Sequence, residues 1–170
     1  MTKPFVAILM GSDSDLPVMQ LTTQVLAQFQ IPFEMKVSSA HRTPERTLAY
    51  VKDAESRGCE VFICAAGMAA HLAGTVAAHT VKPVIGVPLE GSLQGMDSLL
   101  STVQMPAGIP VGCVAIGKAG AQNAAFLSAQ ILALKDAALA IRLKEQRIEN
   151  ANKIAQKDEA LQEKLKQAAV

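Results

Sequence analysis

The chain has 170 residues, half of them apolar, and a formal net charge of +1. This length fits one domain, and the near-neutral charge gives no indication of a basic surface for nucleic acid or an anionic membrane. No apolar run reaches the roughly 20 residues that span a bilayer. The three widely spaced cysteines favour neither a disulfide framework nor a structural zinc site.

The composition also predicts a compartment and an assembly state. The mean hydropathy is +0.25, and the chain has no Trp and one Tyr. Because obligate subunit interfaces resemble a protein core cut in half, we expect the excess apolar surface to be buried in a homo-oligomer. Unpaired cysteines such as Cys64 and Cys113, which lie in apolar runs, indicate the reducing cytoplasm.

Short apolar runs alternate with helical patterns along the chain. Nearly continuous runs of Val and Ile are typical of strands covered on both faces, as in a parallel sheet. The expected strands are Phe5–Met10, Phe33–Val37, Val61–Ala65, Val84–Val87 and Val111–Ile116. The expected helices are roughly Leu16–Phe29, Pro44–Ser56, Ala69–Thr80, Met96–Val103 and Ala119–Leu134.

This alternation predicts an α/β fold, a flavodoxin-like three-layer sandwich with a five-stranded parallel sheet of order 2-1-3-4-5. From residue 135 onward Lys, Arg, Glu and Gln dominate, so we expect a charged C-terminal helical extension over 135–170. With no repeat or internal linker, residues 1–170 are predicted to form a single catalytic domain. Ligands bind such sheets outside the carboxyl ends of the strands, near the first and third.

The loop after the first predicted strand reads Gly11-Ser12-Asp13-Ser14-Asp15. Glycine permits a tight turn, and Ser and Asp side chains cap the helix that follows. The N–H groups at the start of that helix can hold an anion. Alternatively, this loop is only a capped connection between a strand and a helix.

The loop after the second predicted strand, Ser38–Thr43, leads into Pro44, which suits the first turn of a helix. Ser39, His41 and Arg42 are therefore expected at the rim of the sheet. Arginine binds phosphate with a two-pronged guanidinium, and histidine titrates near neutral pH. The alternative is that Arg42 pairs with a surface acid and His41 is an ordinary loop residue.

The third junction, Ala65–Gly74, is rich in small residues that let a ligand approach the backbone. His71 is expected just inside the next helix, as a proton-transfer group or as a packing residue. The histidines lack the spacing of a metal site, and the chain has no phosphate-binding GxxxxGK[ST], dinucleotide-binding GxGxxG or GxSxG nucleophile motif. These absences indicate neither a metal site nor a bound nucleoside triphosphate or dinucleotide.

Longer motifs resemble the aminoimidazole ribonucleotide carboxylase/mutase family over about Phe5–Leu134. They are GSDSD, SSAHRTPER, AAGMAAHLAG, GVPLEGSLQGMDSLLSTVQMPAGIPVGCVAIG and KAGAQNAAFLSAQIL. The combination of SAHRTP with VQMPxGIPVG is highly specific. The resemblance implies a flavodoxin-like subunit, a homo-octamer, and a reaction without metal, ATP or organic cofactor. Met68 and Ala73 depart from the bacterial mutase branch, which commonly has Gly and Pro there.

The resemblance further implies an isomerase of purine (IMP) biosynthesis that converts N5-carboxyaminoimidazole ribonucleotide to 4-carboxy-5-aminoimidazole ribonucleotide. His41 matches the general acid/base, and His71 matches a second catalytic histidine. The implied substrate-binding residues are Gly11, Ser12, Asp15, Ser39, Ala40, Arg42, Gly67, Met68 and Ala69. Two alternatives remain: a carboxylase of aminoimidazole ribonucleotide that uses free carbon dioxide, and a non-catalytic module that binds a phosphate ligand.

Overall fold

The structure is a computed structural model that describes residues 4–168. The outermost residues of the predicted domain, 1–3 and 169–170, lie outside the described range. Contacts within the chain divide it into two compact units, Met1–Ile131 and Leu132–Val170. The first unit contains the sheet, and the second consists mainly of one helix.

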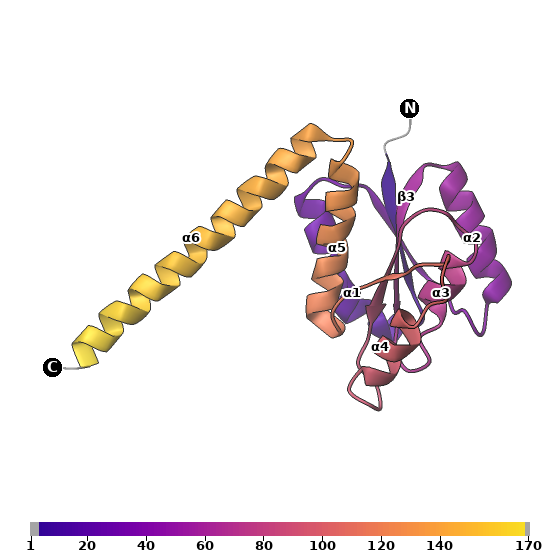
Figure 1. Ribbon diagram of the computed structural model, residues 1–170, viewed down its shortest axis with the longest axis horizontal. Helices are drawn as coiled ribbons and strands as arrows, with labels where there is room; N and C mark the ends of the chain where they lie inside the picture. Colours follow the sequence, from indigo (N-terminus) through magenta and orange to yellow (C-terminus); the bar gives the residue numbers. More distant parts are fainter. Residues whose placement is uncertain (1–3, 169–170) are drawn as a thin grey trace. The chain divides into compact units, whose positions relative to one another are not determined.

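A five-stranded parallel sheet lies at the centre of the first unit (Figure 1), in the predicted order β2-β1-β3-β4-β5. Its strands are β1 (Phe5–Met10), β2 (Phe33–Val37), β3 (Cys59–Ala66), β4 (Val84–Pro88) and β5 (Gly112–Cys113). Met10 at the end of β1 is in register with Val37 of β2 and Ala65 of β3. The carboxyl ends of neighbouring strands therefore meet at one edge of the sheet, as the predicted fold requires.

Helices cover both faces of the sheet. They are α1 (Leu16–Gln28), which follows a single 3-10 turn η1 (Asp13–Asp15), α2 (Pro44–Ser56), α3 (Leu72–Ala77), α4 (Met96–Val103) and α5 (Gly117–Ala133). On one face α1 meets α5, where the Thr22 hydroxyl donates to Ala121 O (2.8 Å) and the Phe29 ring meets Phe126 edge-on. Helices α2, α3 and α4 cover the other face.

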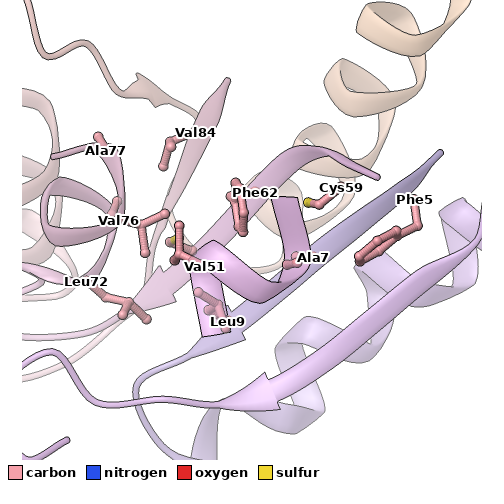
Figure 2. Close-up of a cluster of buried hydrophobic side chains, with 13 residues drawn as sticks. Phe5, Ala7, Leu9, Val51, Cys59, Phe62, Leu72, Val76, Ala77 and Val84 are labelled. Carbon is pink, nitrogen blue, oxygen red and sulfur yellow. The ribbon is translucent and has the colours of Figure 1, made fainter. Parts of the chain in front are cut away.

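A buried cluster joins the sheet to α2 and α3. Figure 2 shows Ala7 and Leu9 of β1 beside Val51 of α2 and Leu72 and Val76 of α3. Every residue of β1 is buried, because alternate side chains point to opposite, covered faces. This confirms that a continuous apolar run marks a central strand.

Some predicted boundaries are wrong at the sheet edges and around α3. The strand predicted over Val111–Ile116 is only Gly112–Cys113, because this edge strand pairs with β4 alone and the chain then turns into α5. Strand β2 is also an edge strand and is largely exposed. The helix predicted over Ala69–Thr80 is only Leu72–Ala77, because the chain bends at Met68 and Ala69 before the helix and turns at Ala78 and His79 after it.

The second unit contains α6 (Ala137–Ala168), which confirms the predicted charged C-terminal helix. Asp136 Oδ1 accepts a hydrogen bond from Leu139 N–H (3.0 Å) at the start of this helix. Leu139 is the buried residue of its 32-residue sequence. Across the described residues, no helix combines the length and the apolar character needed to cross a membrane.

Candidate active site

A cavity of about 530 Å³ lies at the carboxyl edge of the sheet, where the loops after β1, β2, β3 and β4 meet. Every residue that the sequence assigned to a site lines it: Gly11, Ser12, Asp15, Ser39, Ala40, His41, Arg42, Gly67, Met68, Ala69 and His71. The parallel register brings these separate segments together at this single edge.

The loop after β1 is closed by a capping box. Ser12 N–H donates to Asp15 Oδ2 (3.0 Å), and Ser14 N–H donates to Ser12 Oγ (3.3 Å). The predicted caps are therefore present, although they close η1 rather than α1 itself. Burial raises the pKa of the Asp15 carboxyl, while hydrogen bonds from Ser12 and Ser14 act in the opposite direction. The cavity thus holds a carboxylate that is partly withdrawn from water.

The loop after β2 is fixed by hydrogen bonds between its two ends. Ser39 N–H donates a hydrogen bond to Thr43 Oγ1 (3.1 Å), and Thr43 N–H donates one to Ser39 O (2.9 Å). Below them, the buried Ser38 and Thr47 hydroxyls bond to each other (2.6 Å). This small ring holds Ala40, His41 and Arg42 at the cavity rim without using their side chains.

Arg42 remains available to an anion. Its Nη2 donates one long hydrogen bond to Gly11 O (3.5 Å), close to the limit for such bonds. Within the described part of the chain no carboxylate lies within 4.0 Å of this guanidinium, so the alternative of a surface ion pair is wrong. Among the lining residues that the structure describes, Arg42 is the one Lys or Arg.

The loop after β3 presents His71 to the cavity. His71 is the N-cap residue of α3 rather than a residue inside the helix, which corrects the sequence prediction. Its N–H donates to Ala69 O (2.9 Å), and its carbonyl accepts from Thr75 N–H (2.9 Å). The backbone of the loop therefore fixes the position from which the imidazole projects.

His41 and His71 form a hydrogen-bonded pair between the second and third loops. His41 Nε2 lies 2.7 Å from His71 Nδ1, and the rings meet edge to face, with centroids 4.9 Å apart and planes inclined by 86°. Such a bond needs one ring nitrogen to donate and the other to accept. At least one of the two rings is therefore neutral, and the pair can hold one proton in common.

Sequence reasoning missed the part of the cavity that follows β4. Glu90 and Gly91 line it together with Ser14, Ala66 and Leu72. Leu89 N–H donates to Ala66 O (3.0 Å), which ties this loop to the end of β3. The signal was available, because β4 was predicted next to β3 and its carboxyl end had to reach the same edge. Glu90 and Gly91 lie within the motif GVPLEGSLQGM, but none of the roles that the resemblance implies falls on them.

Other parts of the molecule offer less chemistry. A larger hollow of about 890 Å³ lies at the amino end of β4, lined by residues such as Ala77, Val84 and Ile109. Parallel sheets bind ligands at the opposite edge. Burial raises the pKa of the Cys59 thiol to about 11, so this group is no thiolate nucleophile at neutral pH. Among residues 4–168 no cluster of His, Cys, Asp or Glu is arranged to hold a metal ion.

The cavity therefore combines an anion-binding end with a proton-transfer centre. Arg42 supplies a positive charge that no described carboxylate neutralises, and such a guanidinium suits a phosphate. His41 stands next to Arg42 in the loop after β2 and contacts His71 in the loop after β3, and the small residues Gly67 and Ala69 leave room beside this pair. This arrangement suits a phosphorylated small molecule that loses and gains a proton at another of its atoms.

Comparisons with known proteins agree with this description. Residues 5–153 match the family model described as AIR carboxylase. A relative from Pyrococcus horikoshii, named N5-carboxyaminoimidazole ribonucleotide mutase, is 51% identical over 95% of this chain and 90% of its own. The phosphoribosylaminoimidazole carboxylase of Ogataea methanolica is 57% identical over 79% of this chain and 25% of its own. The crystal structure of Treponema denticola PurE superposes with a TM-score of 0.85 and 32% identity, covering 94% of this chain and 99% of that one.

Proposed function

The chain belongs to the AIR carboxylase family, and from this premise we propose that it converts N5-carboxyaminoimidazole ribonucleotide to 4-carboxy-5-aminoimidazole ribonucleotide in purine biosynthesis. The observation that carries this proposal is the bond between His41 Nε2 and His71 Nδ1 (2.7 Å), inside a cavity that also presents Arg42. The reaction moves a carboxylate within one molecule, so a mutase needs phosphate binding and proton transfer rather than an energy source.

The order of the strands suggests how the ribonucleotide lies. Arg42 and the turn at Ser12 belong to the loops after β2 and β1, so the phosphate is placed there. Asp15, in the same turn, accepts hydrogen bonds from ribose hydroxyls. The imidazole ring then extends towards β3 and meets His41. The carboxylate of the substrate then contacts the loop that contains Gly67 and Ala69. This loop excludes water from the carboxylate.

His41 is the proton carrier in the proposed mechanism. The bond between the exocyclic nitrogen and its carboxylate carbon breaks, carbon dioxide leaves, and the nitrogen takes a proton from protonated His41. The C4 carbon of the resulting aminoimidazole then attacks the carbon dioxide and forms a carbon–carbon bond. Neutral His41 accepts the proton that C4 loses. Atoms and charge balance, and the histidine returns to its starting state.

His71 supports this cycle through its bond to His41. A partner nitrogen at 2.7 Å fixes the ring of His41 and selects which of its nitrogens carries the proton. It also offers a site at which the shared proton can stay while carbon dioxide changes its bonding partner. We propose His71 as the second catalytic histidine on this basis.

A carboxylase that uses free carbon dioxide is the second candidate. The relative from Ogataea methanolica favours it, since it carries a carboxylase name at 57% identity. Both reactions share the step in which C4 attacks carbon dioxide, so the same histidine pair serves either one. They differ in whether the carboxylate arrives already attached to the substrate.

Two parallel assays without ATP separate these candidates. One supplies N5-carboxyaminoimidazole ribonucleotide, and the other supplies aminoimidazole ribonucleotide with bicarbonate. We expect rapid turnover in the first and slow turnover in the second. Efficient synthesis in the second with an inert first assay would assign the carboxylase. Inactivity in both would leave a non-catalytic module that binds a phosphate ligand.

We also propose a homo-octamer in the cytoplasm. Exposed apolar side chains on one face of α4 and the segment before it, among them Leu93, Met96, Leu100 and Val103, support burial against further copies. Cys59, Cys64 and Cys113 are unpaired thiols, which suits a reducing compartment.

A further inference from the structure

Met68 adopts an unusual backbone conformation inside the cavity. Its φ is +54°, in the left-handed region, where a residue with a Cβ is strained relative to the right-handed region. Its side chain is 60% exposed although it is large and apolar. Strain of this kind persists where the surrounding structure enforces it, and it gathers at functional sites. Met68 therefore requires an explanation beyond packing.

The Met68 side chain lies close to Gly91 in the loop after β4. A Cβ built on Gly91 would lie 3.4 Å from Met68 Cγ and 3.6 Å from Met68 N, which is ordinary contact distance. Leu89 N–H ties this loop to Ala66 O (3.0 Å), just before Met68. The Met68 side chain therefore lies beside the loop after β4 at the wall of the cavity.

The strand order shows which part of the cavity Met68 and Gly91 border. Because the strand order is β2-β1-β3-β4, Arg42 and Ser12 lie over one half of the cavity, and Met68 and Gly91 lie over the other. His41 stands next to Arg42 in the loop after β2, and its bond to His71 reaches the loop after β3. On the proposed function, on which this inference rests, the carboxylate and the carbon dioxide released from it occupy the half near Met68.

We propose that Met68 is a specificity-determining residue that retains released carbon dioxide at the site. Its flexible, apolar side chain closes the cavity over β3 and β4 against water. Carbon dioxide is small and uncharged, so an apolar cover slows its escape while C4 is positioned to recapture it. Removing the side chain shifts the balance from recapture towards exchange with the solvent pool.

Isotope exchange tests this role. The full chain receives N5-carboxyaminoimidazole ribonucleotide in buffer that contains 13C-bicarbonate and carbonic anhydrase, and mass spectrometry measures the 13C fraction of the early product. We expect little label with the parent protein. For Met68→Ala and Met68→Gly we expect about a fivefold larger labelled fraction, which corresponds to roughly 1 kcal/mol in the barrier to escape.

Other variants separate the side chain from the backbone. Met68→Ala keeps the Cβ and its strain but removes the thioether, whereas Met68→Leu keeps apolar bulk and should retain most of the carbon dioxide. Gln30 has the same left-handed conformation (φ +56°) outside the cavity, so Gln30→Gly controls for strain relief and should not change the labelled fraction. Melting temperatures establish that each variant is folded.

The outcomes are distinct. An unchanged labelled fraction in Met68→Ala, or a rise confined to Met68→Gly, would overturn the role of the side chain. Full labelling by the parent protein would show that no carbon dioxide is retained. A parent protein that makes no product from this substrate would overturn the proposed function, and this inference with it.

Discussion

Asp15 has two opposing effects in this molecule. Its carboxylate caps the turn after β1 by accepting Ser12 N–H, yet its partial burial disfavours the charged form. Because the folded-state pKa is raised above 3.8, protonation favours the folded state, and this contribution is lost as the pH rises through the folded-state pKa. A group retained at such a cost is expected to serve binding.

Asp15→Asn should therefore separate stability from function. The amide oxygen can still accept Ser12 N–H but carries no charge. We expect the free energy of unfolding of the variant, relative to the parent protein, to improve as the pH rises from about 3 to 7. At the same time KM should rise more than tenfold, because the ribose hydroxyls lose a charged acceptor worth ~1.5–3 kcal/mol. Denaturant melts and steady-state assays measure the two effects, and an unchanged KM would contradict the binding role.

The candidate site was largely predictable at the level of residues. Ser12, His41 and Arg42 could be placed because the carboxyl ends of neighbouring parallel strands share one edge. The contact between His41 and His71 could not be predicted, since it depends on the two ring orientations. The left-handed conformation of Met68, in the loop between β3 and α3, could not be predicted either, because no local pattern requires it.

At the level of elements, the alternation of apolar runs and helical patterns predicted the strand order and the central strands. It did not predict the length and exposure of the edge strands. An edge strand has one neighbouring strand instead of two, and this depends on the tertiary structure rather than on the local sequence. As a result, β5 ends at Cys113 and β2 is largely exposed. The contacts between helices could not be predicted from the sequence either. Thr22 is completely buried, and its hydroxyl joins α1 to α5 through Ala121 O (2.8 Å).

Thr22→Val should weaken this contact. The substitution keeps the shape but removes the buried hydrogen bond from the Thr22 hydroxyl to the Ala121 carbonyl, which costs about 0.5–1.5 kcal/mol. The neighbouring Thr23 donates within α1, to Gln20 O (2.8 Å), so Thr23→Val is the matched control and should change stability by less than about 0.5 kcal/mol. Chemical denaturation measures both. Equal losses would show that the bond between α1 and α5 contributes nothing specific.

A contact between β2 and the end of α2 makes the stability of the protein depend on pH. The guanidinium of Arg57, after α2, bonds to Glu34 of β2, and the Tyr50 hydroxyl donates to Glu34 Oε2 (2.9 Å). Hydrogen bonds from Arg57, then from Tyr50, lower the pKa of Glu34 below 4.5. Stability from this cluster is therefore present above 4.5 and is lost as the pH falls through the lowered folded-state pKa.

Glu34→Gln should show this dependence. We expect the variant to be less stable than the parent protein at pH 7 and to approach it as the pH falls below about 4. Thermal melts at several pH values follow the difference. A stability difference that does not change between pH 7 and pH 3 would contradict a contribution from the charged Glu34.

For the whole molecule, composition predicted an oligomer, and that remains a prediction. The structure adds a candidate surface, because Met96, Leu100 and Val103 recur at helical spacing on one exposed face of α4. A surface of this kind on a single chain is typical of a protein interface. The family match over residues 5–153 bears on the subunit and its reaction rather than on the number of copies.

Leu100→Glu should reduce the size of the assembly. A charge placed on this apolar face would be buried unpaired in an interface, so sedimentation velocity should show smaller species with an unchanged circular dichroism spectrum. Lys52→Glu, on the exposed surface of α2, provides the control for a change of charge. An undiminished assembly in Leu100→Glu would place the interface elsewhere.

The most direct test of the central claim is turnover by His41→Asn on N5-carboxyaminoimidazole ribonucleotide, measured together with substrate affinity by calorimetry. The account predicts that binding stays within a few-fold of the parent protein while turnover is abolished, because Arg42 and the turn at Ser12 are intact but the proton carrier is gone. His79→Asn, which changes the histidine outside the cavity, should leave both unchanged. Normal turnover by His41→Asn would contradict the account.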